Sequence, residues 1–398
     1  MELNRRKFLM DTTSAATVLA AAPLLVPTRA FGANDRITYG VIGTGSRASW
    51  LNQAFQKLGA QCVALCDVYE PNLKSAQADS PRDAKAYENH RDLLAQKGLD
   101  CVVIGTPDHH HCPQLLDALA AGKDVYLEKP LSHSLAQSEQ MIKAVRATDR
   151  IVQIGMQRRS MPFVLQAKKV VDEGALGKIS MAKAMWNWPF ALPLDNSPLP
   201  GKLNWDLFQG AAPKRPLEPM RFRWWRAFYD YSGGNMTDQG THLMDVVQWM
   251  TNAGPPQSAV AQGRQVEMPG GDVPNVFSAV FEYPGLIANW TLDYRTVYDF
   301  DWSIQLHGER ASMAMDRFGY RIYRNAEATP TPWSIQGKPD MIAEEPDRGS
   351  TSTEHQQNFL DCVRSRKQPN CTVEIAAAAV SGPHMANIAL RESRKVTR

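Results

Sequence analysis

The stretch Gly40-Val-Ile-Gly-Thr-Gly-Ser-Arg-Ala48 decides the fold of this chain. An apolar-alternating run at residues 36–39 precedes it, and a segment with helical spacing at residues 48–55 follows it. A strand, a glycine turn and a helix in this order are typical of the start of a dinucleotide-binding fold. There, Gly43 and Gly45 let the backbone turn tightly and approach a pyrophosphate. The same pattern also occurs as a plain turn in α/β proteins, so a second feature is needed.

Asp67 supplies that second feature. It ends the apolar run at residues 61–66 and lies about twenty residues after Gly45, where an acid that hydrogen-bonds an adenosine ribose is expected. A carboxylate there repels a 2′-phosphate, so the sequence favours NAD over NADP. Arg47 is a nearby cation that would soften this preference, which leaves NADP open. The pyrophosphate is expected at the helix N-terminus, beside Thr44, Gly45, Ser46 and Arg47.

Length and charge indicate a globular protein of two domains. The chain has 398 residues, whereas single cores stop growing near about 250–300 residues. It has 44 Lys and Arg against 41 Asp and Glu, and the resulting formal charge of +3 does not favour a nucleic-acid or membrane-surface partner. The cysteines show no metal-ligand spacing, and no carboxylates are spaced with the adjacent histidines 109–111, so we expect no metal site.

The N-terminus is typical of a targeting segment. Asn4-Arg-Arg-Lys-Phe-Leu9 precedes a moderately apolar stretch at residues 15–26, which is too short and too rich in alanine for a stable membrane span. This arrangement resembles a twin-arginine (Tat) export signal, with small residues near position 30 for cleavage. An uncleaved amphipathic helix or anchor is the alternative. We expect residues 1–33 to lie outside the fold, and the protein to reach the periplasm or another exported location through the Tat machinery.

Strands and helices alternate up to residue 155, which predicts a parallel sheet over residues 34–155. Thr106-Pro-Asp108 closes the strand at residues 100–105 and leads into a histidine loop, with the next helix expected at residues 113–121. Glu128-Lys-Pro130 closes the strand at residues 124–128. Ligands of open α/β sheets bind outside the carboxyl ends of the strands. The cofactor-site candidates there are Thr106, Pro107, His111, Glu128 and Lys129, and a Glu128–Lys129 ion pair that only fixes the loop is the alternative.

From about residue 156 the pattern changes to that of an α+β domain, expected over residues 156–352. Alternating strands begin near residue 177 and recur at residues 258–268, 277–283, 286–294 and 302–307. They predict a large open, mainly antiparallel sheet with helices on one face. Helical segments within residues 353–398 are expected to pack back on the first domain. The fold class is therefore α/β, with a Rossmann domain followed by this α+β domain.

Residues 187–226 read as a long loop region with seven prolines and many tryptophans. Loops of this length in a compact domain are usually functional or poorly ordered. Aromatic side chains there would stack on a sugar ring or pack at an oligomer contact, and the sequence leaves both open. We expect the specificity for a sugar to lie in this region.

A second chemical constellation follows the Gly233-Gly234 turn. Asp238 and His242 are four residues apart in a segment with helical spacing, so they share one helix face and can address one substrate. A structural histidine with a capping aspartate is the alternative.

Taken together, four motifs resemble the Gfo/Idh/MocA oxidoreductases, a family that includes glucose–fructose oxidoreductase and inositol dehydrogenase. They are G-V-I-G-T-G-S-R, T-P-D-H-H-H, A-A-G-K-D-V-Y-L-E-K-P-L and G-A-L-G-K-I. The resemblance covers almost the whole chain after the leader. It implies that Lys129 lies beside the nicotinamide and the substrate, and that Asp238 and His242 belong to the catalytic helix. It also implies a homo-oligomer, a dimer or tetramer, formed through the other face of the second sheet.

The implied reaction moves a hydride from a sugar or cyclitol carbon to C4 of NAD while the hydroxyl loses its proton. Such a site needs a base with a pKa near neutrality and a cation against developing charge. We expect His242 to be the base, Lys129 to polarise the substrate oxygen, and Asp238 to position the histidine or the sugar hydroxyls. Lysine and histidine roles interchange among relatives, so the proton carrier stays open.

Export would constrain the cofactor, because free NAD is scarce outside the cytoplasm. A tightly bound nicotinamide would be reoxidised in place by a second substrate, or it would serve a redox-neutral glycosidase or epimerase through transient oxidation. The retained Glu128-Lys-Pro130 motif favours the dehydrogenase form. A non-catalytic sugar or nucleotide sensor is a further alternative, which the presence of Lys129 and His242 disfavours.

Overall fold

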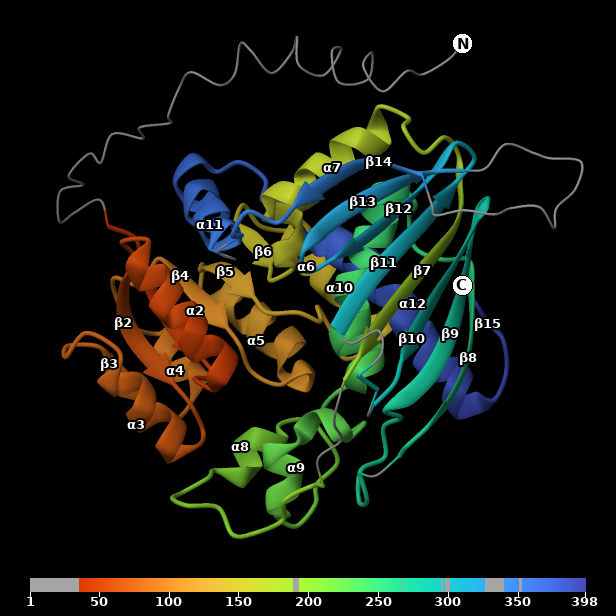
Figure 1. Ribbon diagram of the computed structural model, residues 1–398. Coiled ribbons are helices and arrows are strands. Elements are labelled where there is room, and N and C mark those ends of the chain that lie inside the picture. The colour runs from red at the N-terminus through yellow and green to blue at the C-terminus, as the bar shows by residue number, and fades with distance from the viewer. Residues whose placement is uncertain are drawn as a thin grey trace, which may run out of the picture.

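The computed structural model describes residues 36–188, 193–266, 268–294, 296–297, 301–325, 340–350 and 353–398. The segment at residues 1–33 that resembles an export signal lies outside these ranges. The described chain contains one six-stranded and one nine-stranded sheet, each flanked by helices (Figure 1). This arrangement confirms the predicted fold class. None of the described helices is long and apolar enough to cross a lipid bilayer.

The first sheet is parallel throughout, with the strand order β3-β2-β1-β4-β5-β6. Its strands are β1 (Thr38–Ile42), β2 (Gln61–Cys66), β3 (Lys85–Tyr87), β4 (Cys101–Ile104), β5 (Asp124–Leu127) and β6 (Val152–Ile154). The intervening helices are α2 (Ser46–Lys57), α3 (Glu70–Ala78), α4 (His90–Leu94), α5 (Asp108–Ala120) and α6 (Leu135–Arg146). The strand order reverses direction between β1 and β4, and this switch point opens a crevice at the carboxyl ends of the strands.

Helix α5 begins earlier than the sequence predicted. It includes Asp108 and the three histidines, and Pro113 lies inside it. The prediction was wrong because it used Pro113 as the start of the helix. In the structure the histidines have different partners: His109 and His110 both contact the carbonyl oxygen of Phe208, whereas His111 turns towards the loop after β5. Within the described residues, no three His, Cys, Asp or Glu side chains form a group that could hold a metal ion.

The second sheet has the order β14-β13-β12-β11-β7-β10-β9-β8-β15. Only the pairing of β7 with β10 is parallel among these neighbours. Its strands are β7 (Ile179–Asn187), β8 (Ser258–Arg264), β9 (Val276–Tyr283), β10 (Leu286–Leu292), β11 (Asp301–Gly308), β12 (Ala311–Asp316), β13 (Gly319–Arg324), β14 (Met341–Pro346) and β15 (Val396–Thr397). The sequence missed β12 to β15.

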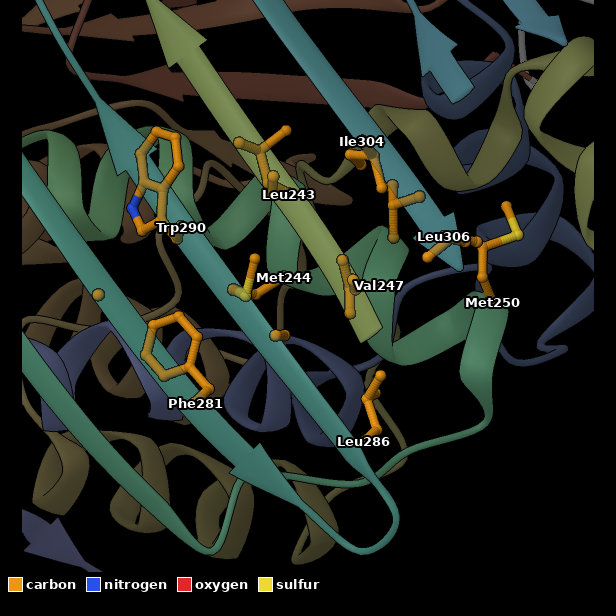
Figure 2. Packing of buried hydrophobic residues seen from close by; sticks show 14 of the residues in the cluster. Leu243, Met244, Val247, Met250, Phe281, Leu286, Trp290, Ile304 and Leu306 are labelled. Atoms are coloured by element: carbon orange, nitrogen blue, oxygen red, sulfur yellow. The ribbon is translucent and has the colours of Figure 1, made fainter. Parts of the chain in front are cut away.

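Helices α7 (Pro162–Asp172) and α10 (Gly234–Thr251) cover one face of this sheet (Figure 1). Figure 2 shows the apolar side chains of α10 against those of the strands. Leu243, Met244 and Val247 belong to the same buried cluster as Trp290 and Ile304. Burial of apolar surface contributes about 25 cal/mol per Å², so this face fixes α10 firmly and, with it, the polar residues near its N-terminal end.

The two C-terminal helices pack against different parts of the protein. Phe359 of α11 (Glu354–Ser365) packs against Phe55 and Tyr126 of the first domain, with ring centroids 6.0 and 5.8 Å apart. In α12 (Val373–Glu392), Val373 lies in the core of the first sheet and Met385 in the core of the second. Helix α12 therefore packs on the first domain, as the sequence predicted, and also on the second, which the sequence did not indicate.

Two buried histidines in these helices predict a loss of stability in acid. Burial, as the largest cause, lowers the pKa of His355 to about 4 and that of His384 to about 3. In the unfolded chain both take up protons below about pH 6.5, so stability is complete above that pH and falls as the pH drops towards 4. Between pH 6.5 and 5 we expect each to cost about 1 kcal/mol per pH unit. Urea unfolding at pH 7 and pH 5 measures this loss.

The matched variant is His384→Gln, which keeps a donor towards the carbonyl oxygen of Ser132 but cannot take up a proton. It is expected to lose less stability than the wild type over the same pH interval. Equal losses in the two proteins would contradict the explanation, because the contributions of all other groups cancel in the comparison.

Candidate functional site

A cavity of about 720 Å³ opens at the carboxyl ends of β1, β2 and β4. Volumes of roughly 300–1,000 Å³ are typical of small-molecule and cofactor sites. Six predicted residues line it: Gly43, Gly45, Ser46, Asp67, Thr106 and Pro107. Five others do not line it: Thr44, Arg47, His111, Glu128 and Lys129.

The two glycines of the first turn have different roles. Gly43 has φ of 78°, and a Cβ added to it would lie 2.6 Å from Thr106 Cγ2 and 2.9 Å from the Thr106 backbone nitrogen. A side chain at Gly43 would therefore be strained and would clash with β4's end. A Cβ at Gly45 would meet nothing within 4 Å. The open space lies beside the N-terminus of α2, whose free N–H groups suit a pyrophosphate.

Asp67 braces this turn from the end of β2. Its Oδ2 accepts hydrogen bonds from the Thr44 backbone N–H at 2.7 Å and the Thr44 hydroxyl at 3.0 Å, and its Oδ1 accepts from the Tyr69 N–H. Burial raises the pKa of Asp67, and these hydrogen bonds act in the opposite direction. Asp67 also lines the cavity, where the ribose of a dinucleotide is expected.

Arg47 does not face the ribose end of the cavity. Its Nε donates to Glu128 Oε1 at 2.8 Å, and its guanidinium lies over the Trp50 ring. The expectation that Arg47 softens the preference for NAD is therefore corrected, because its charge is paired elsewhere. Arg91 and Arg223 are the arginines that line the cavity.

A second part of the cavity wall comes from residues 193–231, which we call the cover segment. It carries the short helices α8 (Trp205–Gln209), α9 (Pro219–Arg223) and η3 (Trp225–Ala227). Phe208, Phe222, Arg223 and Trp225 from this segment line the cavity. The predicted sugar-specificity region thus lies partly over the nucleotide site, while residues 189–192 of it fall outside the described residues.

The cover segment is tied to the loop after β2, beside Asp67. Leu203 forms a bridge with Tyr69, and the Asn204 N–H donates to the Val68 carbonyl oxygen at 2.8 Å. At the cavity's other side, His109 and His110 lie within hydrogen-bond distance of the Phe208 carbonyl oxygen. Contacts on both sides of the crevice therefore hold this segment in place.

Lys129 and Asp238 meet across the two domains. Lys129 Nζ donates to Asp238 Oδ1 at 2.6 Å and to the Asp238 carbonyl oxygen at 3.2 Å. Arg226 Nε lies 3.4 Å from the same Oδ1. Burial alone would raise the pKa of Asp238, but the charges of Lys129 and Arg226 outweigh it and lower the pKa to about 2. Asp238 is therefore a carboxylate that holds Lys129 in position.

His242 lies one helical turn beyond Asp238 and is buried, but it is not bonded to Asp238. Its Nδ1 is buried and has no hydrogen-bond partner. Burial, and then the charges of Arg158 and Lys129, lower the pKa of His242 well below its usual value. The expected near-neutral pKa is thus corrected: the imidazole is uncharged at neutral pH and free to accept a proton or hydrogen bond.

His111 and Glu128 support the lysine loop. The two ring nitrogens of His111 lie 2.7 Å from the Pro130 carbonyl oxygen and 2.9 Å from that of Thr106. Glu128 Oε2 accepts a hydrogen bond from the Lys129 backbone N–H at 3.2 Å, while its Oε1 pairs with Arg47. Both side chains connect the loops at the strand ends, and Lys129 pairs with Asp238 rather than with Glu128.

Sequence reasoning missed Arg158, Trp186 and Arg226. Arg158 lies in η2 (Gln157–Ser160), directly after β6, so the strand-end rule that identified Lys129 would also have found it. Trp186, on β7, was included only in a strand, and its ring centroid is 6.3 Å from that of His242. Nothing local in the sequence marks Arg226, because its role depends on a contact with Asp238.

Comparison with known proteins agrees with this geometry. The model of an oxidoreductase family with an NAD-binding Rossmann fold, GFO_IDH_MocA, matches residues 37–156. The model of the GFO/IDH/MocA C-terminal domain matches residues 164–314. Together the two matches cover more than half of the chain, with the whole first sheet and β7 to β11 of the second.

Individual relatives are more distant. Inositol 2-dehydrogenase of Gluconacetobacter diazotrophicus is 34% identical over 149 residues, which make up 37% of this chain and 44% of that protein. The match thus spans less than half of the relative's length. Among solved structures, levoglucosan dehydrogenase in complex with NADH has a TM-score of 0.71 at 17% identity, covering 91% of this chain and 99% of that one.

The WlbA dehydrogenase from Bordetella pertussis, solved with NADH and UDP-GlcNAcA, has a TM-score of 0.70 at 19% identity. Here 91% of this chain and 98% of that chain are covered. At these identities the likeness shows a shared fold over nearly the full length of both proteins.

Proposed function

Because the chain belongs to the Gfo/Idh/MocA oxidoreductase family, we propose that it transfers a hydride between a sugar or cyclitol hydroxyl and a tightly bound nicotinamide cofactor. The observation that carries the proposal is the meeting of Lys129, Asp238 and an uncharged His242 beside the Rossmann domain's crevice. The names of two similar proteins, inositol 2-dehydrogenase and levoglucosan dehydrogenase, support this substrate class.

Different residues of the site stabilise charge and accept the proton. The nicotinamide, when bound, supplies hydride transfer at its C4. The Lys129 ammonium, held by Asp238, polarises the substrate oxygen and stabilises negative charge that develops there. Neutral His242 has a buried Nδ1 without a partner and accepts the hydroxyl proton or orients that hydroxyl. The pKa of Asp238, about 2, excludes it as the base at neutral pH.

The cofactor-binding residues also fit a dinucleotide. The turn at Gly45 leaves open space beside a helix N-terminus, and Asp67 ends the neighbouring strand. The cover segment supports tight binding, because Phe208 and Trp225 line the cavity while Leu203 ties the segment to the first domain. A cofactor beneath such a cover leaves only when these contacts open.

A redox-neutral glycosidase or epimerase is the second candidate. It also requires a retained cofactor, so the same cover segment supports it. We further propose export through the Tat machinery, from the twin arginines Arg5 and Arg6, and assembly into a homo-oligomer. Cell fractionation and the mass of the native protein in solution test these two proposals.

The purified protein provides the test of function. We expect nicotinamide to co-purify and to survive extensive dialysis, and we expect its near-ultraviolet absorbance to change when a sugar or cyclitol is added. Trp225→Ala, which opens the cover, is expected to speed NADH dissociation about tenfold or more, since a buried aromatic contact contributes roughly 1.5–3 kcal/mol.

Stopped-flow displacement of NADH measures that rate, and Trp249→Phe, a change on the far part of α10, serves as the control. Cleavage of a glycoside without net absorbance change would favour the redox-neutral candidate. If no nicotinamide is bound or can be bound, the proposed function is wrong.

A further inference from the structure

Arg158 differs from the other cations around the catalytic helix. Its neighbours are each paired with a carboxylate: Lys129 and Arg226 with Asp238, Arg159 with Asp245, Arg47 with Glu128 and Arg317 with Asp301. In the part of the chain that the structure describes, Arg158 pairs with no carboxylate. A buried cation without a partner is costly, so this one requires an explanation.

The environment of Arg158 holds its guanidinium in place but does not satisfy it. The residue is 5% exposed, and its Nε is buried without a hydrogen-bond acceptor. The guanidinium lies over the rings of Trp186 and Trp302, at 5.1 and 4.4 Å from their centroids. Such cation–π contacts offset part of the desolvation cost. They leave the Nε–H donor, which points along the plane of the group, unpaired.

Trp186 is a second residue with an unpaired hydrogen-bond donor, and it lies close to His242. Its indole Nε1 is also buried without a partner, and its ring lies 6.3 Å from that of His242. Arg158 is in turn the largest charge acting on His242. Two unpaired donors therefore lie close to the imidazole of His242.

The chemistry of the donors selects the ligand. Arginine and tryptophan side chains donate hydrogen bonds and accept none. A ligand group that satisfies both must accept at two points, and one that balances the guanidinium must carry negative charge. A carboxylate meets both conditions and matches the planar fork of an arginine. A neutral sugar hydroxyl would add no negative charge beside Arg158, whose neighbouring carboxylates, Asp301 and Asp245, are already paired with Arg317 and Arg159.

We propose that the substrate is a sugar acid, such as a uronate, whose carboxylate is bound by Arg158 and Trp186 while Lys129 and His242 face its reacting hydroxyl. This inference rests on the proposed function and names the substrate class of the same site. Arg158 thereby determines specificity, whereas Lys129 and His242 perform the reaction.

The test compares matched pairs of substrates on the wild-type holoenzyme: D-glucose with D-glucuronate, and D-galactose with D-galacturonate. Binding is followed by tryptophan fluorescence, because the ligand would contact Trp186, and turnover is followed by nicotinamide absorbance. For at least one pair we expect the acid to bind about tenfold or more tightly than the neutral sugar, the effect of a charged hydrogen bond. Glucose 6-phosphate is included as an anion of different geometry.

Variants then assign the preference to the residue. Arg158→Met is expected to abolish the preference for the acid, and Arg158→Lys to restore part of it by returning the charge. Arg310→Met removes an exposed arginine of the same domain and controls for net charge. Circular dichroism and NADH binding establish that each variant is folded.

Two results would overturn the inference: no acid binds more tightly than its neutral partner, or the phosphate is preferred over both acids. The wild-type comparison stands even if Arg158→Met fails to fold. Failure of the proposed function is distinct, since it requires that no sugar, neutral or acidic, reduces the bound nicotinamide.

Discussion

Lys129→Ala is expected to lower kcat by about 10²–10⁴-fold, the usual contribution of a positioned proton-transfer or charge-stabilising group. The ammonium is held 2.6 Å from Asp238 Oδ1 at the meeting point of the two domains, where no other described lysine lies within bonding distance of Asp238. Because Lys129 does not line the cavity below the cover segment, the Kd for NADH is expected to change little. Steady-state turnover and NADH titration measure the two quantities.

The control separates the role of charge from that of structure. Asp238 remains paired with Arg226 in the variant, so the buried carboxylate keeps one cation and the fold should survive. Lys129→Arg keeps the charge and is expected to retain the fold with low turnover, because the longer, planar guanidinium cannot place its charge where the compact ammonium stands. Full activity of Lys129→Ala would remove Lys129 from the mechanism.

Gly43→Ala and Gly45→Ala are expected to fail in different ways. At Gly43 an added Cβ meets the Thr106 backbone at 2.9 Å with φ of 78°, so the variant is expected to lower the stability of the cofactor-free protein by about 1–3 kcal/mol. At Gly45 the added Cβ meets open space at an ordinary φ of −64°. The cofactor-free Gly45→Ala protein should therefore unfold like the wild type.

Gly45→Ala is instead expected to weaken cofactor binding. The space beside it is where we place the pyrophosphate, so its methyl group is expected to raise the Kd for NADH at least about tenfold, a penalty of about 1.4 kcal/mol. Thermal unfolding without cofactor and NADH titration give the two readouts. Unchanged NADH affinity in Gly45→Ala would contradict the placement of the dinucleotide.

The local sequence pattern predicted the position of Asp67 but not the orientation of the Arg47 side chain. The spacing of Asp67 from the glycine turn predicted its place on the cavity wall, since strand and helix lengths determine that distance. The direction in which Arg47 points was not predictable in the same way. Its partner, Glu128, is 81 residues away and lies on another strand end.

The second domain was predicted less completely for a related reason. The sequence indicated β7 to β11 from their alternation, but it missed β12 and β13, which have only six residues each. It also missed the parallel pairing of β7 with β10, because that pairing joins strands more than a hundred residues apart.

The sequence by itself determined the parallel sheet, the glycine turn, the position of Lys129 at a strand end and the shared helix face of Asp238 and His242. These follow from periodicity and from short, stiff connections, which act over a few residues. Only the tertiary structure decided that Lys129 pairs with Asp238, that side chains of residues 193–231 line the nucleotide cavity and that, among the described residues, no carboxylate forms an ion pair with Arg158. Each of these depends on how two separately patterned domains meet, and that contact is set by the packing of α10 and α12 rather than by any local spacing.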